Sequence, residues 1–247
     1  GNAFETMTKQ TFDNYHLNTN DGRVVSLNSD EGVMFLVNKL ANPSNGSTAL
    51  QVFFAHTGLS EKAVDLISKS LKLDAIPTVC EQLEPQLVQI YGDINTLSGD
   101  FDKFSNEKSV SYSSYKDALT HYIKTLDKEY EAKAPAEKKV YVAYRNFLAK
   151  TQNADFAKNL TPEQIMPALA KIHDLGIQSV SNSAAQGAQQ LNEYALTIES
   201  RLSAMKALKL PENSEQEAVR EQFVADAESA YEKLADTIDK VNAAING

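Results

Sequence analysis

The sequence predicts an all-α protein, an elongated antiparallel helical bundle that ends in a long C-terminal helical hairpin. Apolar residues recur every three or four positions through most of the chain after residue 58, which is the spacing of the buried face of an α-helix. Two such stripes cover residues 177–208 and 219–245, and only a short segment around Pro211 separates them. Because so short a connection makes two helices antiparallel neighbours, we expect these two to fold back on each other.

Short polar motifs mark the beginnings of several helices. Residues 214–217 (Ser-Glu-Gln-Glu) form a capping box for the last helix, in which the serine accepts from a backbone N–H and the glutamate reaches back. Residues 161–164 (Thr-Pro-Glu-Gln) carry the same signal and predict a short helix that ends near Gly176. Ser60 is a suitable N-cap for a helix over residues 61–71.

Three further helices are expected in the middle of the chain. Apolar stripes over residues 79–104 and 112–130 each indicate one long helix, and residues 106–111 separate them. Pro85 lies in the first of these helices, either near its start or at a kink. Pro135 suits the first turn of a third helix, where the missing N–H of proline costs nothing.

The first 58 residues differ from the rest and predict a more irregular N-terminal part. Asp21 and Gly22 lie between two short β-prone runs, residues 15–17 and 24–27. An Asp-Gly pair in this setting indicates a small β-hairpin with a type I′ turn, which needs positive φ at both central residues. An irregular loop is the alternative interpretation.

The rest of this N-terminal part predicts two short helices. Ser29 or Asp30 would cap a helix over residues 30–40. A cluster of turn-forming residues follows at 42–46 (Asn-Pro-Ser-Asn-Gly), and a shorter helix is expected over residues 48–56.

The composition places the chain among ordinary globular proteins. Of its 247 residues, 42% are hydrophobic and 23% are charged, and the net charge is −9. This length accommodates a single domain, which we assign to residues 1–247, with the irregular part in residues 1–58 and the helical bundle in residues 59–247. The net negative charge, with Lys and Arg scattered among the acids, argues against nucleic acid as a partner and against a basic membrane-binding surface.

The expected location of the protein rests on indirect signals. No apolar run approaches the roughly 18–20 residues that span a bilayer, so no transmembrane helix is expected in this chain. Cys80 is the only cysteine, which excludes an internal disulfide and fits either a cytoplasmic protein or an exported bacterial one. The sequence begins with Gly1 instead of Met, so we expect that a signal peptide or lipid anchor lay outside it. These signals favour the periplasm or an outer-membrane-anchored lipoprotein.

No residue pattern indicates catalysis or a cofactor. The chain contains no Gly-x-Ser-x-Gly nucleophile motif, no Gly-rich phosphate loop and no Glu-x-x-His pair of the kind that holds a di-iron centre. Asp117 and His121 share one face of a predicted helix, but two ligands alone do not make a metal site, and we interpret them as a surface pair. We therefore expect a protein that is not an enzyme, without catalytic residues, metal ligands or cofactors.

Tyrosine is concentrated in the middle of the chain, and tryptophan is absent. Rings with an apolar body and a polar hydroxyl suit a ligand groove or a protein interface. The five tyrosines that we predict as binding residues are Tyr112, Tyr115, Tyr122, Tyr141 and Tyr144. Their helical spacing also fits the alternative that they lie at the boundary between core and surface.

Two short elements occur close together within residues 95–131. They read Asp-Phe-Asp-Lys-Phe at residues 100–104 and Ser-Tyr-Lys-Asp at residues 114–117. An aspartate-rich helix end that leads into a Tyr-Lys-Asp element resembles a family of uncharacterised helical lipoproteins exported by Gram-negative bacteria. In that family a second acid usually follows, where this chain has Ala118. The resemblance implies a periplasmic or membrane-tethered helical domain, and it carries over no functional residue.

The sequence thus favours a non-enzymatic exported helical protein with a binding or envelope-structural role. Its expected partner is another envelope protein or a small ligand, and its oligomeric state is left open. Two alternatives also remain open. One is a helical pore-forming toxin or secreted effector, and the other is a metal or small-ligand carrier with its site in the bundle core.

Overall fold

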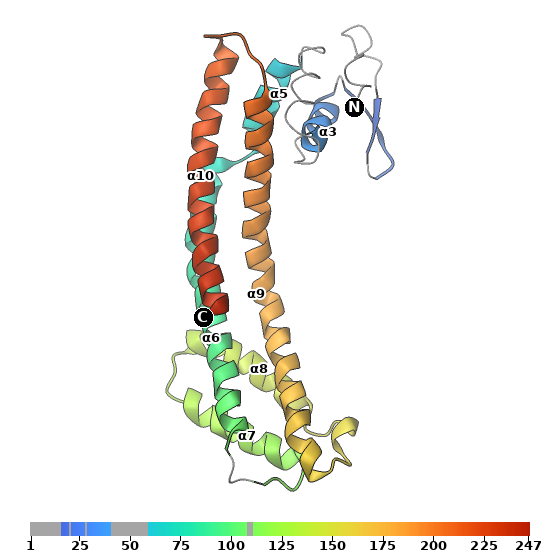
Figure 1. Ribbon diagram of the computed structural model, residues 1–247, viewed down its shortest axis with the longest axis vertical. Helices are drawn as coiled ribbons and strands as arrows, with labels where there is room; N and C mark the ends of the chain where they lie inside the picture. Colours follow the sequence, from blue (N-terminus) through green and yellow to red (C-terminus); the bar gives the residue numbers. More distant parts are fainter. Residues whose placement is uncertain (1–15, 20, 28, 41–58, 108–110) are drawn as a thin grey trace. The chain divides into compact units, whose positions relative to one another are not determined.

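The computed structural model describes residues 16–19, 21–27, 29–40, 59–107 and 111–247, and these residues are almost entirely helical (Figure 1). The strands found among them form one two-stranded sheet. The prediction of an all-α fold with a long C-terminal helical hairpin is therefore confirmed. The short helix expected over residues 48–56, with the turn before it, lies outside the described residues.

The chain divides into two compact units, and neither is continuous in sequence. The first unit combines residues 1–80 with 191–236, and the second combines residues 81–190 with 237–247. The helices α6 (Ile76–Ser105), α9 (Pro162–Ala207) and α10 (Glu215–Asn246) each contribute residues to both units. The assignment of residues 1–247 to one domain stays a prediction.

The N-terminal β-hairpin is confirmed, but its turn differs from the predicted one. Strand β1 (His16–Asn18) pairs antiparallel with β2 (Val24–Ser26). Gly22 has a φ of 81°, whereas Asp21 is not among the residues with positive φ. The type I′ prediction is therefore wrong. The N–H of Gly22 donates to the carbonyl of Thr19 at 3.1 Å, which makes a turn with glycine in its left-handed position.

Two short helices follow the hairpin among the described residues of the N-terminal part. Helix α3 (Asp30–Leu40) begins as predicted, because the Ser29 hydroxyl accepts the N–H of Gly32 at 3.0 Å. A Cβ at position 32 would overlap the carbonyl oxygen of Ser26, so only glycine lets α3 approach β2 this closely. Helix α5 (Ser60–Ser70) starts at the expected place, but Leu59 and not Ser60 is its N-cap, without a side-chain hydrogen bond.

In the first unit, α9 and α10 pack as antiparallel neighbours, as predicted. The Tyr231 hydroxyl donates to Glu199 at 2.6 Å, and Lys206 pairs with Glu228 at 3.0 Å, so later residues of one helix meet earlier residues of the other. The predicted capping box before α10 is half present. Ser214 Oγ accepts the N–H of Glu217 at 3.1 Å, whereas the N–H of Ser214 donates to a carbonyl in the preceding turn.

Helix α9 is longer than the sequence predicts. A short helix was expected to end near Gly176, but α9 continues through it as one helix of 46 residues, which Figure 1 shows without a break. The glycine serves close packing instead of termination: a Cβ at position 176 would come within 3.0 Å of the Tyr144 ring and 3.1 Å of the Phe147 ring. The expectation of a helix end at Gly176 is therefore wrong.

The second unit gathers α7 (Tyr115–Tyr130) and α8 (Lys139–Lys150) around the parts of α6 and α9 that belong to it. Pro135 opens a short 3-10 turn (Pro135–Lys138) that leads directly into α8. Helix α7 is capped by Ser114, whose hydroxyl accepts the N–H of Asp117 at 3.1 Å. The core of this unit is rich in aromatic side chains. Within the described part of the chain, no helix combines the length and the apolar character needed to cross a membrane.

Candidate functional site

The five tyrosines predicted as binding residues lie in the second unit, and most belong to its core. Tyr115, Tyr122 and Tyr144 are fully buried, Tyr141 is 7% exposed, and Tyr112 is half-buried. They therefore do not line an open surface together, and the packing matches the alternative interpretation of core and boundary residues more closely. Their role in binding stays a prediction.

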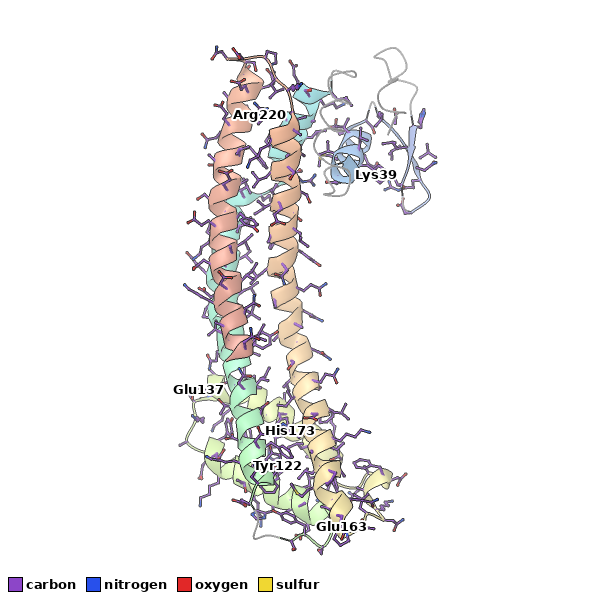
Figure 2. The ribbon with its side chains drawn as sticks, in the orientation of Figure 1. Lys39, Tyr122, Glu137, Glu163, His173 and Arg220 are labelled. Carbon is purple, nitrogen blue, oxygen red and sulfur yellow. The ribbon has the colours of Figure 1, made fainter. Side chains whose placement is uncertain are left out.

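All five hydroxyl groups have hydrogen-bond partners inside the protein. Tyr122 and Tyr144 share a bond of 2.8 Å, and Tyr144 also bonds to Nδ1 of the buried His173. Figure 2 shows Tyr122 and His173 between the helices of this unit. His173 stacks on Phe101 with ring centroids 4.2 Å apart, and burial lowers the pKa of its imidazole.

The remaining hydroxyls are held in the same way. Tyr115 bonds to the Thr151 hydroxyl at 2.6 Å, and Tyr112 bonds to Nδ1 of His121 at 3.1 Å. The expected Asp117–His121 surface pair is thus replaced by a Tyr112–His121 contact. The Tyr141 hydroxyl donates to Asp127, which completes the set.

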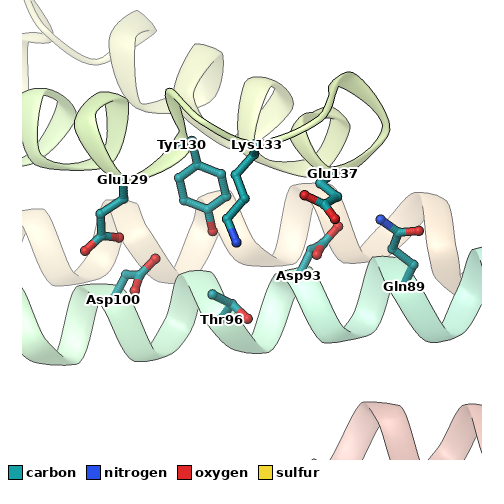
Figure 3. A pocket seen from close by; sticks show the side chains of 8 residues that line it. All are labelled: Gln89, Asp93, Thr96, Asp100, Glu129, Tyr130, Lys133 and Glu137. Atoms are coloured by element: carbon teal, nitrogen blue, oxygen red, sulfur yellow. The ribbon is translucent and has the colours of Figure 1, made fainter.

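A sixth tyrosine, Tyr130, lies at the edge of a polar pocket of about 380 Å³. Helix α6 supplies one wall, the end of α7 supplies another, and the segment between α7 and α8 closes the third side (Figure 3). We call it the acidic pocket, and its lining residues are Gln89, Asp93, Thr96, Asp100, Glu129, Tyr130, Lys133 and Glu137.

The wall from α6 follows from helical geometry. Its four lining residues stand at positions 89, 93, 96 and 100, a spacing of four, three and four that places them on one face of the helix. The buried residues Leu87, Ile94, Leu97 and Phe101 form the neighbouring apolar face of the same helix. Helix α6 therefore presents a core face and a polar pocket face side by side.

Negative charge dominates the acidic pocket, because four carboxylates and one ammonium group line it. Burial, together with the neighbouring Glu129 carboxylate, raises the pKa of Asp100 to about 6. Burial and the charge of Glu137 raise the pKa of Asp93, and the ammonium group of Lys133 partly opposes this. The single lysine therefore does not neutralise the pocket.

Two polar atoms in the acidic pocket are incompletely paired. The Tyr130 hydroxyl and Oδ2 of Asp100 are buried, and neither makes a hydrogen bond of normal geometry to a described residue, although the two groups are close enough for the hydroxyl to lower the pKa of Asp100. Tyr130 is only 5% exposed, and its ring stacks on that of Tyr141 with centroids 4.3 Å apart and an interplanar angle of 3°. Its hydroxyl points into the pocket (Figure 3). An unpaired buried polar group costs about 1–3 kcal/mol, so such atoms are normally met by a water molecule or a ligand.

The neighbouring pocket is more apolar. It encloses about 500 Å³ and shares Gln89 and Asp93 with the acidic pocket. Ile90, Val140 and Val180 contribute its apolar lining. Across the described residues, no three His, Cys, Asp or Glu side chains are arranged to hold a metal ion.

The acidic pocket is absent from the sequence-based prediction. Its only local signal is the polar spacing of residues 89–100 on a helix recognised by its apolar stripe. The partners Glu129 and Glu137 come from other elements, and one sequence does not reveal which helices meet.

Comparison with known proteins adds no relative from which a function could be transferred. The chain matches no protein family model, and no similar protein was found among curated proteins or solved structures. The resemblance to exported lipoproteins stays a prediction. In the structure, its Ser-Tyr-Lys-Asp element at residues 114–117 is the N-terminal cap of α7.

Proposed function

We propose that this chain is a non-enzymatic binding protein that holds a small organic cation in the acidic pocket. The buried Tyr130 hydroxyl is the observation that supports this most strongly, because it points, without a hydrogen bond of normal geometry to a described residue, into a pocket lined by four carboxylates. A protonated amine carries three donors and one positive charge. It would bond the unpaired oxygen atoms and reduce the repulsion among the carboxylates.

The type of ligand follows from the charge of the lining. An anion would meet four carboxylates and only one lysine, so its binding is opposed electrostatically. A neutral ligand would leave the repulsion unchanged. Export to the periplasm, attachment as a lipoprotein and an envelope role remain proposals that rest on the sequence alone.

A titration of the full chain with ethylammonium chloride, followed by amide NMR at pH 7.5 and low salt, tests the proposal. We expect shifts centred on Asp93, Asp100 and Tyr130, and none with sodium propionate as the matched anion. Because a hydrogen bond to a charged group contributes about 1.5–3 kcal/mol, a chain with both Asp93→Asn and Asp100→Asn should bind at least tenfold more weakly.

Glu163→Gln is the matched control, since this exposed carboxylate in the first turn of α9 lies outside the acidic pocket. Its affinity for ethylammonium should equal that of the unmodified chain. Equal affinity in the Asp93→Asn, Asp100→Asn chain, or no binding at millimolar ethylammonium, would refute the proposal.

A further inference from the structure

The carboxylates of the acidic pocket are arranged as two separate pairs. Glu137 faces Asp93 at one end, and Glu129 faces Asp100 at the other (Figure 3). In each pair, one acid comes from α6 and the other from α7 or the segment after it. The mutual repulsion within each pair is a cause of the raised pKa values of Asp93 and Asp100.

The distance between the two pairs is set by α6. Asp93 and Asp100 are seven residues apart on one helix face, which corresponds to about 10 Å along the helix axis. Tyr130, Thr96 and Lys133 lie between the pairs (Figure 3). The hydroxyls of Tyr130 and Thr96 are therefore placed along the line that joins the two ends.

We infer that the acidic pocket binds a linear diamine, with one protonated amine at the Asp93–Glu137 pair and the other at the Asp100–Glu129 pair. This inference rests on the proposed function and specifies its ligand. Each pair of acids takes one cation, since one ammonium group can donate to two carboxylates at once. The Tyr130 hydroxyl is the second observation, because it is buried, lacks a hydrogen bond of normal geometry to a described residue and is directed into the space that the ligand would occupy.

Lys133 has a defined part in this arrangement. Its ammonium group is the only basic group among the lining residues, and it lies between the two acid pairs. A bound diamine would be repelled by it. Lys133 therefore weakens the binding of dications. In the empty pocket, its positive charge reduces the repulsion among the four carboxylates.

Titration calorimetry of the full chain with α,ω-diaminoalkanes, from propane-1,3-diamine to decane-1,10-diamine, tests the inference. We expect the tightest binding near seven methylene groups, since such a chain spans about 10 Å between its nitrogens. That diamine should bind at least tenfold more tightly than heptylamine and than propane-1,3-diamine, because only it engages both acid pairs.

Single substitutions sharpen the test. Asp93→Asn and Asp100→Asn should each lower the affinity for heptane-1,7-diamine at least tenfold, while the affinity for heptylamine falls about twofold because one intact pair remains. Lys133→Gln should raise the affinity for the diamine severalfold. Glu163→Gln is again the control with no expected effect.

The outcomes separate this inference from the proposed function. Equal affinity for heptylamine and heptane-1,7-diamine, or affinity that rises steadily with chain length in both series, would overturn the diamine inference. Binding of ethylammonium would still support the proposed function in either case. If neither monoamines nor diamines bind, both proposals fail.

Discussion

The second unit contains two buried tyrosine sites that differ in one respect. In the core, the hydroxyls of Tyr122 and Tyr144 bond to each other, and Tyr144 also bonds to His173. In the acidic pocket, the Tyr130 hydroxyl is also buried but makes no hydrogen bond of normal geometry to a described residue. Since buried polar groups are normally paired, the protein itself accounts for the first site, whereas the second is where we propose that a ligand binds.

The two sites originate from one helix face. Tyr122 and Tyr130 are eight residues apart in α7, which is close to two helical turns. Both rings contact α8, Tyr122 through Tyr144 and Tyr130 through Tyr141. What differs is the surroundings of the hydroxyl: that of Tyr122 meets the Tyr144 hydroxyl, whereas that of Tyr130 lies beside the carboxylates that line the pocket. The residue type alone therefore does not show whether a buried tyrosine has a structural role; the partners of its hydroxyl do.

The largest effect is expected for Tyr144→Phe. This change removes a hydroxyl that serves both Tyr122 and His173 and leaves two buried groups short of a partner. We expect a loss of about 2–3 kcal/mol in the free energy of unfolding. Urea unfolding followed by circular dichroism measures it, with Tyr231→Phe as a control at a hydroxyl that is part of an exposed contact. If Tyr144→Phe lowers the free energy of unfolding by less than Tyr231→Phe does, the Tyr144 hydroxyl does not have this structural role.

A smaller, pH-dependent effect is expected for Asp100→Asn. The pKa of Asp100 in the folded chain is about 6, above the usual range of an aspartate, so the folded state holds this proton more tightly than the unfolded state. Stability from this group is complete at low pH and is lost as the pH rises through about 6. Because solvent screens the partly exposed carboxylate, we expect the variant to gain about 1 kcal/mol at pH 7.5.

The pH profile distinguishes this cause from a general packing effect. The gain of Asp100→Asn should disappear at pH 4, where the carboxyl group is already protonated. Urea unfolding at both pH values tests this. A gain of the same size at pH 4 and pH 7.5 would show that ionisation of Asp100 is not its source.

The smallest effect on stability is expected for Tyr130→Phe. The hydroxyl that this change removes is buried and makes no hydrogen bond of normal geometry to a described residue, so its loss should not lower the free energy of unfolding and should raise it by up to about 1 kcal/mol. The same variant should bind ethylammonium severalfold more weakly in the NMR titration. If Tyr130→Phe destabilises the chain as much as Tyr144→Phe, the distinction between the two sites is lost.

Elements with strong local signals are predicted well by the sequence. The hairpin around Gly22, the Ser29 cap of α3 and the Ser214 cap of α10 each depend on residues close together in the chain. Gly176 misled the prediction because a glycine that ends a helix and a glycine that admits a neighbouring ring look alike in sequence. Only the packing of Tyr144 against it decides between the two.

The candidate site also depends on contacts between elements that the sequence does not predict. The sequence draws attention to the tyrosines because they are abundant in the middle of the chain. It does not show that Tyr115 bonds to Thr151 or that Tyr112 bonds to His121. The acidic pocket needs carboxylates from α6 and from the segment after α7. Such pairings across elements are set by tertiary packing, which the periodicity of one helix does not contain.

The division of the chain into two discontinuous units has a consequence for how the protein is made. Helix α10 follows every other described element, and it supplies residues 215–236 to the first unit and residues 237–246 to the second. On the ribosome, neither unit holds its full set of residues until α10 has emerged. The apolar residues of α6 in the second unit can pack against α7 and α8 before then, whereas the part of α9 in the first unit lacks its α10 partner until α10 emerges, which exposes that part of the nascent chain to aggregation.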